Sequence, residues 1–252
     1  MSINSFNILN TRIDAVQTDD VIKIIDEFLE RKDRFYYICS TNANNVINAF
    51  ESEYYNNVMN KCDISLPDSV PFLWIGRLLK YPLFKRCGIE EIMLNIFSQS
   101  EKGKNYRHYF YGNTNEVLDK LEKKLKNTYP KIIIAGMYSP PFRELSNYEE
   151  KKIIQKINSS NPDFLWVSLG CPRQEKWLYD HKNVLNPMIG AGAGAVFNFL
   201  AGETSKAPRF IQYLGLEWIY RLLNDPKKLA KRYCIKYTKF VLLFLIDFLK
   251  RI

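Results

Sequence analysis

Residues 164–177 read FLWVSLGCPRQEKW, in which an apolar run meets a short turn and then the start of a helix. Comparable apolar runs recur at Phe35–Cys39, Asp63–Leu66, His108–Tyr111, Lys131–Ala135 and Met188–Ile189. Helical spacing of apolar residues alternates with these runs, at Asp19–Glu30, Asn115–Asn127 and Asn147–Asn158. Such alternation predicts an α/β fold with a mostly parallel, Rossmann-like sheet and flanking helices.

Polar and glycine-containing clusters follow the predicted strands. They are Ser40-Thr41-Asn42, Pro67-Asp68, Gly112-Asn113, Gly136, Gly170–Glu175 and Gly190–Gly192. Open α/β sheets bind their ligands beyond the carboxyl ends of the strands. We therefore expect these clusters to line one rim of the sheet and to form a binding cleft there.

Asp68 follows a predicted strand and precedes the apolar segment 70–79. A carboxylate in this position can take a proton from an acceptor hydroxyl, but an Asp or Ser there can equally cap a helix. The same two interpretations apply to Ser40, Thr41 and Asn42, whose polar groups bind sugar or phosphate oxygens or cap the next helix. Arg86 can hold a diphosphate through two parallel hydrogen bonds.

Gln174 and Glu175 open the helix that follows Gly170, where a glycine lets the backbone approach a ligand. The alternative is an ordinary helix start with Glu175 at its positive end. The segment Gly190–Gly194 lacks the G-x-G-x-x-G spacing of a dinucleotide loop, which argues against a nucleotide-dependent oxidoreductase. Its backbone amides can still hold a phosphate.

The chain of 252 residues carries 36 Lys and Arg against 27 Asp and Glu, a net charge of +9 that favours anionic partners. Much of this excess lies near the C-terminus, beside the apolar segment 241–249. That segment is too short to span a bilayer and is typical of an interfacial helix. Packing on the core or on a dimer partner is the alternative. We predict a core at 1–205 and a helical tail at 206–252 that binds anionic membrane through 227–252.

Several classes of protein are disfavoured by what the sequence lacks. The five cysteines show no CxxC spacing, which predicts reduced thiols and neither a metal nor a cofactor. The N-terminal residues carry no signal pattern, so we expect a cytoplasmic protein. Basic residues interleave with aliphatic ones rather than with an exposed aromatic platform, which argues against nucleic acid.

These residues resemble the WecG/TagA/CpsF glycosyltransferases (glycosyltransferase family 26) over nearly the whole chain, up to about residue 233. The segments that carry the resemblance are Ser40-Thr41-Asn42 with Val46 and Ala49, Pro67-Asp68, Arg86–Gly88, Tyr129-Pro130 before KIIIAG, Pro162-Asp163 before LGCPRQEKW, 200–202, 206–208, 215–221 and Asp225-Pro226. The order of PxQE and GLEWxxR is specific to that family.

The resemblance implies transfer of a sugar with inversion, without a metal, from a UDP-sugar to a polyprenyl-diphosphate-linked sugar. This reaction serves bacterial cell-surface polysaccharide synthesis at the inner face of the plasma membrane. A non-catalytic, membrane-associated nucleotide-binding module is the alternative. A homo-oligomer is compatible with the sequence, which does not name the donor sugar.

The resemblance also assigns roles to single residues. The family's base falls on Asp68, its strand-end hydroxyl and amide on Ser40 and Asn42, and its diphosphate arginine on Arg86. Its glutamine falls on Gln174. Further binding residues that we predict are Thr41, Gly136, Glu175, Asn198, Arg221, Lys228 and Lys231.

The chain departs from the family pattern at several positions. Ser69-Val70-Pro71 stands in place of Gly-x-Gly, and Asn198 in place of an Asp near the nucleotide. Lys206 replaces the first residue of an Arg-Ala-Pro motif, and Lys228 and Lys231 fall where arginines are common. These departures bear on the identity of the donor rather than on the class of reaction.

Overall fold

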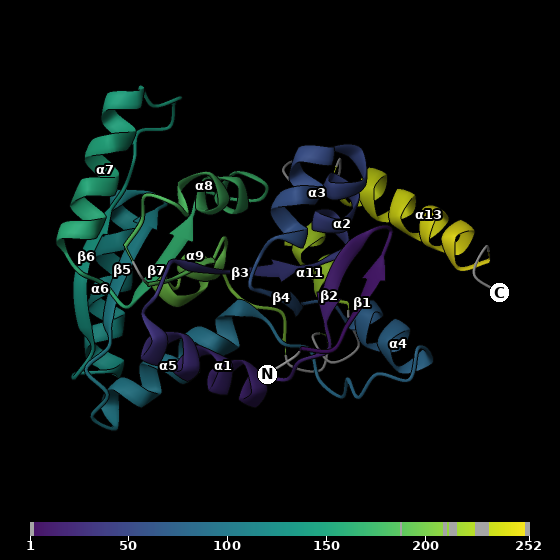
Figure 1. The fold of residues 1–252 in the computed structure, drawn as a ribbon, viewed down its shortest axis with the longest axis horizontal. Coiled ribbons are helices and arrows are strands. Elements are labelled where there is room, and N and C mark those ends of the chain that lie inside the picture. The colour runs from purple at the N-terminus through teal and green to yellow at the C-terminus, as the bar shows by residue number, and fades with distance from the viewer. Residues whose placement is uncertain (1–2, 187, 209–210, 212–215, 225–231, 250–252) are drawn as a thin grey trace.

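The computed structural model describes residues 3–186, 188–208, 211, 216–224 and 232–249, and a six-stranded sheet forms its centre (Figure 1). The strand order is β4 (Ile64–Pro67), β3 (Tyr36–Thr41), β8 (Ile189–Gly192), β7 (Phe164–Ser168), β5 (Arg107–Gly112) and β6 (Ile133–Tyr138). Every neighbouring pair in this sheet is parallel. The predicted α/β class is confirmed.

Helices cover both faces of the sheet. One layer contains α1 (Thr18–Arg31), α5 (Ile89–Glu101), α6 (Asn115–Thr128) and α9 (Val196–Ala201). The other contains α2 (Ala43–Glu51), α3 (Glu53–Asn60), α7 (Asn147–Ser159) and α8 (Arg173–His181). Phe164 and Trp166 of β7 pack in the first layer, and Leu165 and Val167 in the second. Because successive strand residues point to opposite faces, a strand covered on both sides is apolar throughout.

A small antiparallel hairpin, which the sequence analysis did not predict, precedes this sheet. It consists of β1 (Ser5–Ile8) and β2 (Thr11–Asp14), joined by Leu9 and Asn10, which both have positive φ values of 47° and 63°. The hairpin packs with α2 and with α4 (Val70–Leu78) around a third apolar cluster. A turn of two positive-φ residues without glycine gives a weak signal in the sequence.

The tail is helical, as predicted, and it packs on the core. Its described elements are α11 (Glu217–Asn224), a π-helix η1 (Arg232–Tyr237) and α13 (Thr238–Leu249). Phe240 of α13 is buried against Phe72 of α4, with ring centroids 5.9 Å apart. Lys239 Nζ lies 2.6 Å from Glu51 Oε1 of α2.

Part of α13 nevertheless faces solvent. Its exposed apolar residues are Val241, Leu242, Leu245, Ile246 and Leu249. Within the described ranges, no helix is both long enough and apolar enough to cross a membrane. The contacts of α13 with α4 and α2 support packing of the tail on the core, whereas membrane binding by the tail and the division at residue 205 stay predictions.

Four glycines expected after strands belong to the strands themselves. Gly136 lies within β6 and Gly190 within β8, whereas Gly112 and Gly192 are the last residues of β5 and β8. A Cβ atom at Gly136 would lie 2.5 Å from the Tyr109 ring, and one at Gly190 would lie 2.3 Å from Phe35. Gly136 and Gly190 make room for aromatic side chains of the core, so the prediction that these two follow strand ends is wrong. Gly192 and Gly194 lie at and just beyond the carboxyl end of β8, so the phosphate-binding role of this segment stays a prediction.

His108 of β5 is fully buried among aromatic rings of the first layer. Trp166 Nε1 donates a hydrogen bond to His108 Nδ1 at 3.3 Å. Burial lowers the pKa of His108 from 6.5 to about 3. The unfolded chain therefore binds a proton between these two values that the folded protein does not bind.

This difference predicts a pH dependence of stability. As the pH falls below about 6.5, protonation of His108 in the unfolded state favours unfolding by up to about 1.4 kcal/mol for each pH unit. His108→Asn keeps an acceptor near Trp166 and removes the titrating group, so its free energy of unfolding should fall less steeply between pH 6.5 and 4.5. Urea unfolding followed by tryptophan fluorescence measures both slopes, and equal slopes would contradict the assignment.

Candidate active site

Asp68 lies at the carboxyl end of β4, beside the end of β3. Ser40 Oγ donates a hydrogen bond to Asp68 Oδ2 at 2.5 Å, and Arg86 Nη1 lies 3.5 Å from Asp68 Oδ1. The backbone N–H of Asp68 donates to the Thr41 carbonyl at 3.0 Å. The N-cap residue of α4 is Ser69. The capping interpretation of Asp68 is therefore wrong, and its carboxylate instead joins Ser40 to Arg86.

Gly88 allows this carboxylate to approach the start of α5. A Cβ atom at Gly88, the N-cap of α5, would lie 2.8 Å from Asp68 Oδ1. The Cys87 backbone N–H donates to the Pro67 carbonyl at 3.3 Å, which ties this segment to the end of β4. The positive end of a helix stabilises a carboxylate placed against it. The Asp68 carboxylate thus lies beside the N-terminus of α5, where the helix dipole attracts negative charge.

Arg86 connects the site to the tail. Its Nη1 atom lies 3.0 Å from Glu217 Oε2 of α11, so two carboxylates share one guanidinium nitrogen. Asp68, and to a lesser degree Glu217, raises the pKa of Arg86 above its usual value. Glu217 was not among the predicted site residues. The signal available in the sequence was its position in the segment 215–221, which carries part of the family resemblance.

A chain of hydrogen bonds runs from Asn42 across the sheet edge to Gln174. The Asn42 backbone N–H donates to Asn45 Oδ1 at 3.3 Å, and Asn45 Nδ2 donates to the Tyr55 hydroxyl at 2.9 Å. Tyr55 donates to Glu175 Oε2 at 3.2 Å, and Gln174 Nε2 donates to Glu175 Oε1 at 2.8 Å. Gln174 and Glu175 are both buried, so this network fixes their side chains.

The remaining polar atoms of Gln174 and Asn42, and the hydroxyl of Thr41, lie in different settings. Among the described residues, Gln174 Oε1 is buried without a hydrogen-bond partner, beside the end of β8. Asn42 Oδ1 accepts from the backbone N–H groups of Asn44 and Asn45, so Asn42 caps α2. Thr41 Oγ1 is buried 2.7 Å from Ser65 Oγ. Thr41 and Asn42 thus support the strand end next to Asp68.

Asn198 and Gly136 lie further along the sheet. Asn198 Oδ1 of α9 accepts from Asn113 Nδ2 at 2.9 Å, just beyond the end of β5. Gly136 belongs to the edge strand β6, five strand spacings from β4, which corresponds to about 24 Å. The structure therefore brings Ser40, Asp68 and Arg86 together and leaves Gly136 apart from them.

The predicted tail residues are described only in part. Arg221 lies in α11, the helix that brings Glu217 to Arg86. Lys228 and Lys231 lie outside the described residues. In the part of the chain that the structure describes, no group of three or more His, Cys, Asp or Glu side chains is arranged to hold a metal ion.

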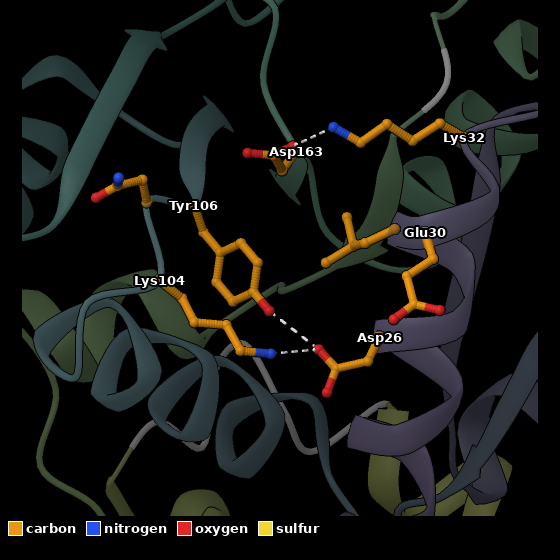
Figure 2. A pocket seen from close by; sticks show the side chains of 8 residues that line it. Asp26, Glu30, Lys32, Lys104, Tyr106 and Asp163 are labelled. Carbon is orange, nitrogen blue, oxygen red and sulfur yellow. Dashed lines mark hydrogen bonds and ion pairs between the residues drawn. The ribbon is translucent and has the colours of Figure 1, made fainter.

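A surface hollow of about 460 Å³ lies at the amino ends of the strands, the end of the sheet opposite to Asp68 (Figure 2). Its charged side chains pair with one another, with Lys104 Nζ 2.9 Å from Asp26 Oδ1 and Lys32 Nζ 3.6 Å from Asp163 Oδ1. It adjoins the amino ends of β5 and β7, whereas parallel sheets bind ligands at the carboxyl ends. The Asp68 cluster is therefore the candidate site.

Comparison with known proteins identifies relatives. The model of the Glycosyl transferase WecG/TagA/CpsF family matches residues 6–252. The N-acetylglucosaminyldiphosphoundecaprenol N-acetyl-beta-D-mannosaminyltransferase of Bacillus spizizenii is 27% identical over 231 residues, which cover 91% of this chain and 87% of that protein. The enzyme of the same name from Bacillus subtilis is 28% identical over 81% of this chain and 78% of its own length. The one from Staphylococcus aureus strain MW2 is 26% identical over 77% and 74%.

The shared guanidinium predicts a coupling between Arg86 and Glu217. These side chains are only 29% and 18% exposed, so a double-mutant cycle of Arg86→Gln and Glu217→Gln should give a coupling of about 1 kcal/mol in the free energy of unfolding. The Lys120–Glu203 pair, 57% and 37% exposed, is the matched control and should give a smaller coupling, because solvent screens an exposed ion pair. Urea unfolding measures both cycles, and equal couplings would contradict a specific contact between Arg86 of the core and Glu217 of the tail.

Proposed function

Since the chain belongs to the WecG/TagA/CpsF family and is a glycosyltransferase, we propose that it moves a sugar from a UDP-sugar to a polyprenyl-diphosphate-linked sugar. The names of the relatives support N-acetylmannosamine as the transferred sugar and N-acetylglucosaminyl-diphospho-undecaprenol as the acceptor. The product belongs to a bacterial cell-surface polysaccharide.

The observation that carries the proposed mechanism is the setting of Asp68 between Ser40 and Arg86. The acceptor hydroxyl oxygen forms a bond to the anomeric carbon of the donor while the bond from that carbon to the diphosphate oxygen breaks. Asp68 takes the hydroxyl proton, and UDP leaves with the bonding electrons. A single displacement of this kind inverts the anomeric configuration. Ser40 orients the Asp68 carboxylate through the oxygen that does not face Arg86.

Arg86 meets the charge of the leaving diphosphate in this proposal. It already faces the two carboxylates of Asp68 and Glu217, so a diphosphate must displace Glu217 or find further cations. Arg221, Lys228 and Lys231 of the tail supply such cations. Each lysine contacts a phosphate as a point charge, whereas an arginine can use two parallel hydrogen bonds.

Two further residues bind the donor in this proposal. Gln174 Oε1, buried and without a partner among the described residues, can accept a hydrogen bond from a sugar or ribose hydroxyl. Asn198 offers both a donor and an acceptor where an Asp offers acceptors alone.

The tail binds the inner face of the plasma membrane in the same proposal, so that the enzyme works from the cytoplasm on a lipid-linked acceptor. The apolar side of α13 and the basic residues of 227–252 support this location. Basic residues beside an apolar helix face favour an anionic bilayer surface.

Release of UDP by the purified protein tests the proposed reaction. UDP-N-acetylmannosamine heads a panel of UDP-sugars, each assayed with and without a short-chain polyprenyl-diphospho-N-acetylglucosamine. Acceptor-dependent release from one donor supports the proposal and identifies the sugar. No release from any donor, with no binding of UDP, favours a non-catalytic membrane-associated module instead.

Replacement of Asp68 predicts loss of chemistry without loss of nucleotide binding. Asp68→Asn keeps the size of the side chain and removes the base, so turnover should fall by about 10²–10⁴-fold while the Kd for UDP changes by less than about threefold. Asp63→Asn, at the amino end of the same strand, is the matched control and should retain turnover. An unchanged rate in Asp68→Asn would remove Asp68 from the role of base.

A further inference from the structure

Three large apolar side chains lie on the surface of α4 and of the turn that follows it. Trp74 is 60% exposed, Leu78 is 61% exposed, and Phe84 is 69% exposed. Trp74 and Leu78 are one helical turn apart and share a face of α4. The Arg77 guanidinium donates to the carbonyls of Leu83 and Phe84, at 2.7 and 2.8 Å, which holds the turn against that helix. We refer to Trp74, Leu78 and Phe84 as the α4 surface.

The exposure of Phe84 follows from an ordered turn. Leu83, its neighbour, is fully buried, and a Cβ atom at Gly76 would lie 2.6 Å from Leu83 Cδ1. The Tyr81 backbone N–H donates to the Gly76 carbonyl, and the Tyr81 hydroxyl donates to the Ser5 carbonyl, both at 2.8 Å. With Leu83 directed inward, the next side chain points outward. An ordered, exposed apolar patch of this kind marks a site of interaction.

The charge around this patch identifies the kind of partner. Residues 70–86 contain no Asp or Glu, and their cations are Arg77, Lys80, Lys85 and Arg86, of which Arg86 is paired with Asp68 and Glu217 in the site and does not belong to the patch. Tryptophan, phenylalanine and leucine bordered by lysine and arginine are typical of surfaces that enter the headgroup region of an anionic bilayer. A protein partner with an apolar face would not by itself require this one-sided charge.

The inner side of α4 contacts the tail. Phe72, on the inner side of α4, packs against Phe240 of α13. Both helices lie at the end of the molecule away from α6 and α7 (Figure 1). The exposed apolar residues of α13 are thus carried on a helix that contacts α4 directly.

We propose that the α4 surface binds the anionic phospholipid bilayer as a second attachment point, in addition to the tail. The inference rests on the proposed function, because it assigns the lipid-linked acceptor to that bilayer. Asp68 stands two residues before α4, and Arg86 follows Phe84 by two residues. A helix of nine residues is about 13 Å long, so contact of α4 with the bilayer holds both site residues close to the lipid headgroups.

Binding of the full-length protein to vesicles of phosphatidylglycerol and phosphatidylcholine tests the proposal. The variant Trp74→Ser/Leu78→Ser/Phe84→Ser should bind at least about tenfold more weakly than the unchanged protein, because each large apolar side chain contributes strongly to transfer out of water. Phe142→Ser/Tyr148→Ser removes two exposed aromatic residues near α7 and is the matched control, which should bind normally. The variant Leu242→Ser/Leu245→Ser/Ile246→Ser measures how much the tail contributes to vesicle binding.

Equal vesicle binding by the α4 variant and the unchanged protein would overturn the proposal. So would sedimentation showing that the α4 variant only dissociates a dimer. Circular dichroism and thermal unfolding should be unchanged, since the replaced side chains are mostly exposed.

Turnover separates this proposal from the proposed reaction. With a water-soluble acceptor the α4 variant should keep its rate, and with an acceptor embedded in vesicles it should lose activity. Failure of the unchanged protein on the soluble acceptor, with vesicle binding intact, contradicts the reaction and leaves the α4 surface supported.

Discussion

Parallel pairing of all six strands forces every connection in the large sheet to cross back over one of its faces. Helices must therefore cover both faces, and the turns that leave the strands meet at one edge. Ser40 and Asp68 come together there because β3 and β4 are neighbours in the sheet, although 28 residues separate them in the chain. Asn113, which follows β5, and Asn198, on the helix after β8, meet at the same edge although β7 lies between their strands.

At the carboxyl ends of β3 and β4, the positive charge of Arg86 faces the negative charges of nearby carboxylates. Arg86 lies between Asp68 and Glu217, and Glu91 of α5 also raises the pKa of Arg86. Burial raises the pKa of Glu91, so a proton is held more readily on Glu91 than on an exposed glutamate. An anionic ligand that enters this site competes with the carboxylates of Asp68 and Glu217 for the Arg86 guanidinium. Part of the tail thus takes the position on Arg86 that the proposed mechanism gives to a phosphate.

The alternation of apolar runs and helical patterns was enough to predict the parallel sheet. The position of Asp68 at a strand end left a cap and a base both open, and the family resemblance singled it out as the base. Glycines in β6 and β8 were misplaced, because a glycine that makes room for an aromatic ring of another element looks the same in sequence as one in a turn. The contact of Arg86 with Glu217 joins residues 131 positions apart, and no local pattern encodes it. Asn42 and Asp68 both admitted a capping role, and only the direction of their side chains separates them.

The last strand in the described part of the chain, β8, lies in the middle of the sheet between β3 and β7. A polypeptide grows from its N-terminus, so the β3–β4 pair and the β5–β6–β7 group exist before the strand that joins them has been synthesised. Until residue 192 is available, β3 and β7 each present an unpaired edge that can recruit another extended chain. The order of strands therefore makes the nascent protein most open to aggregation late in its synthesis, when most of its apolar residues have already been added.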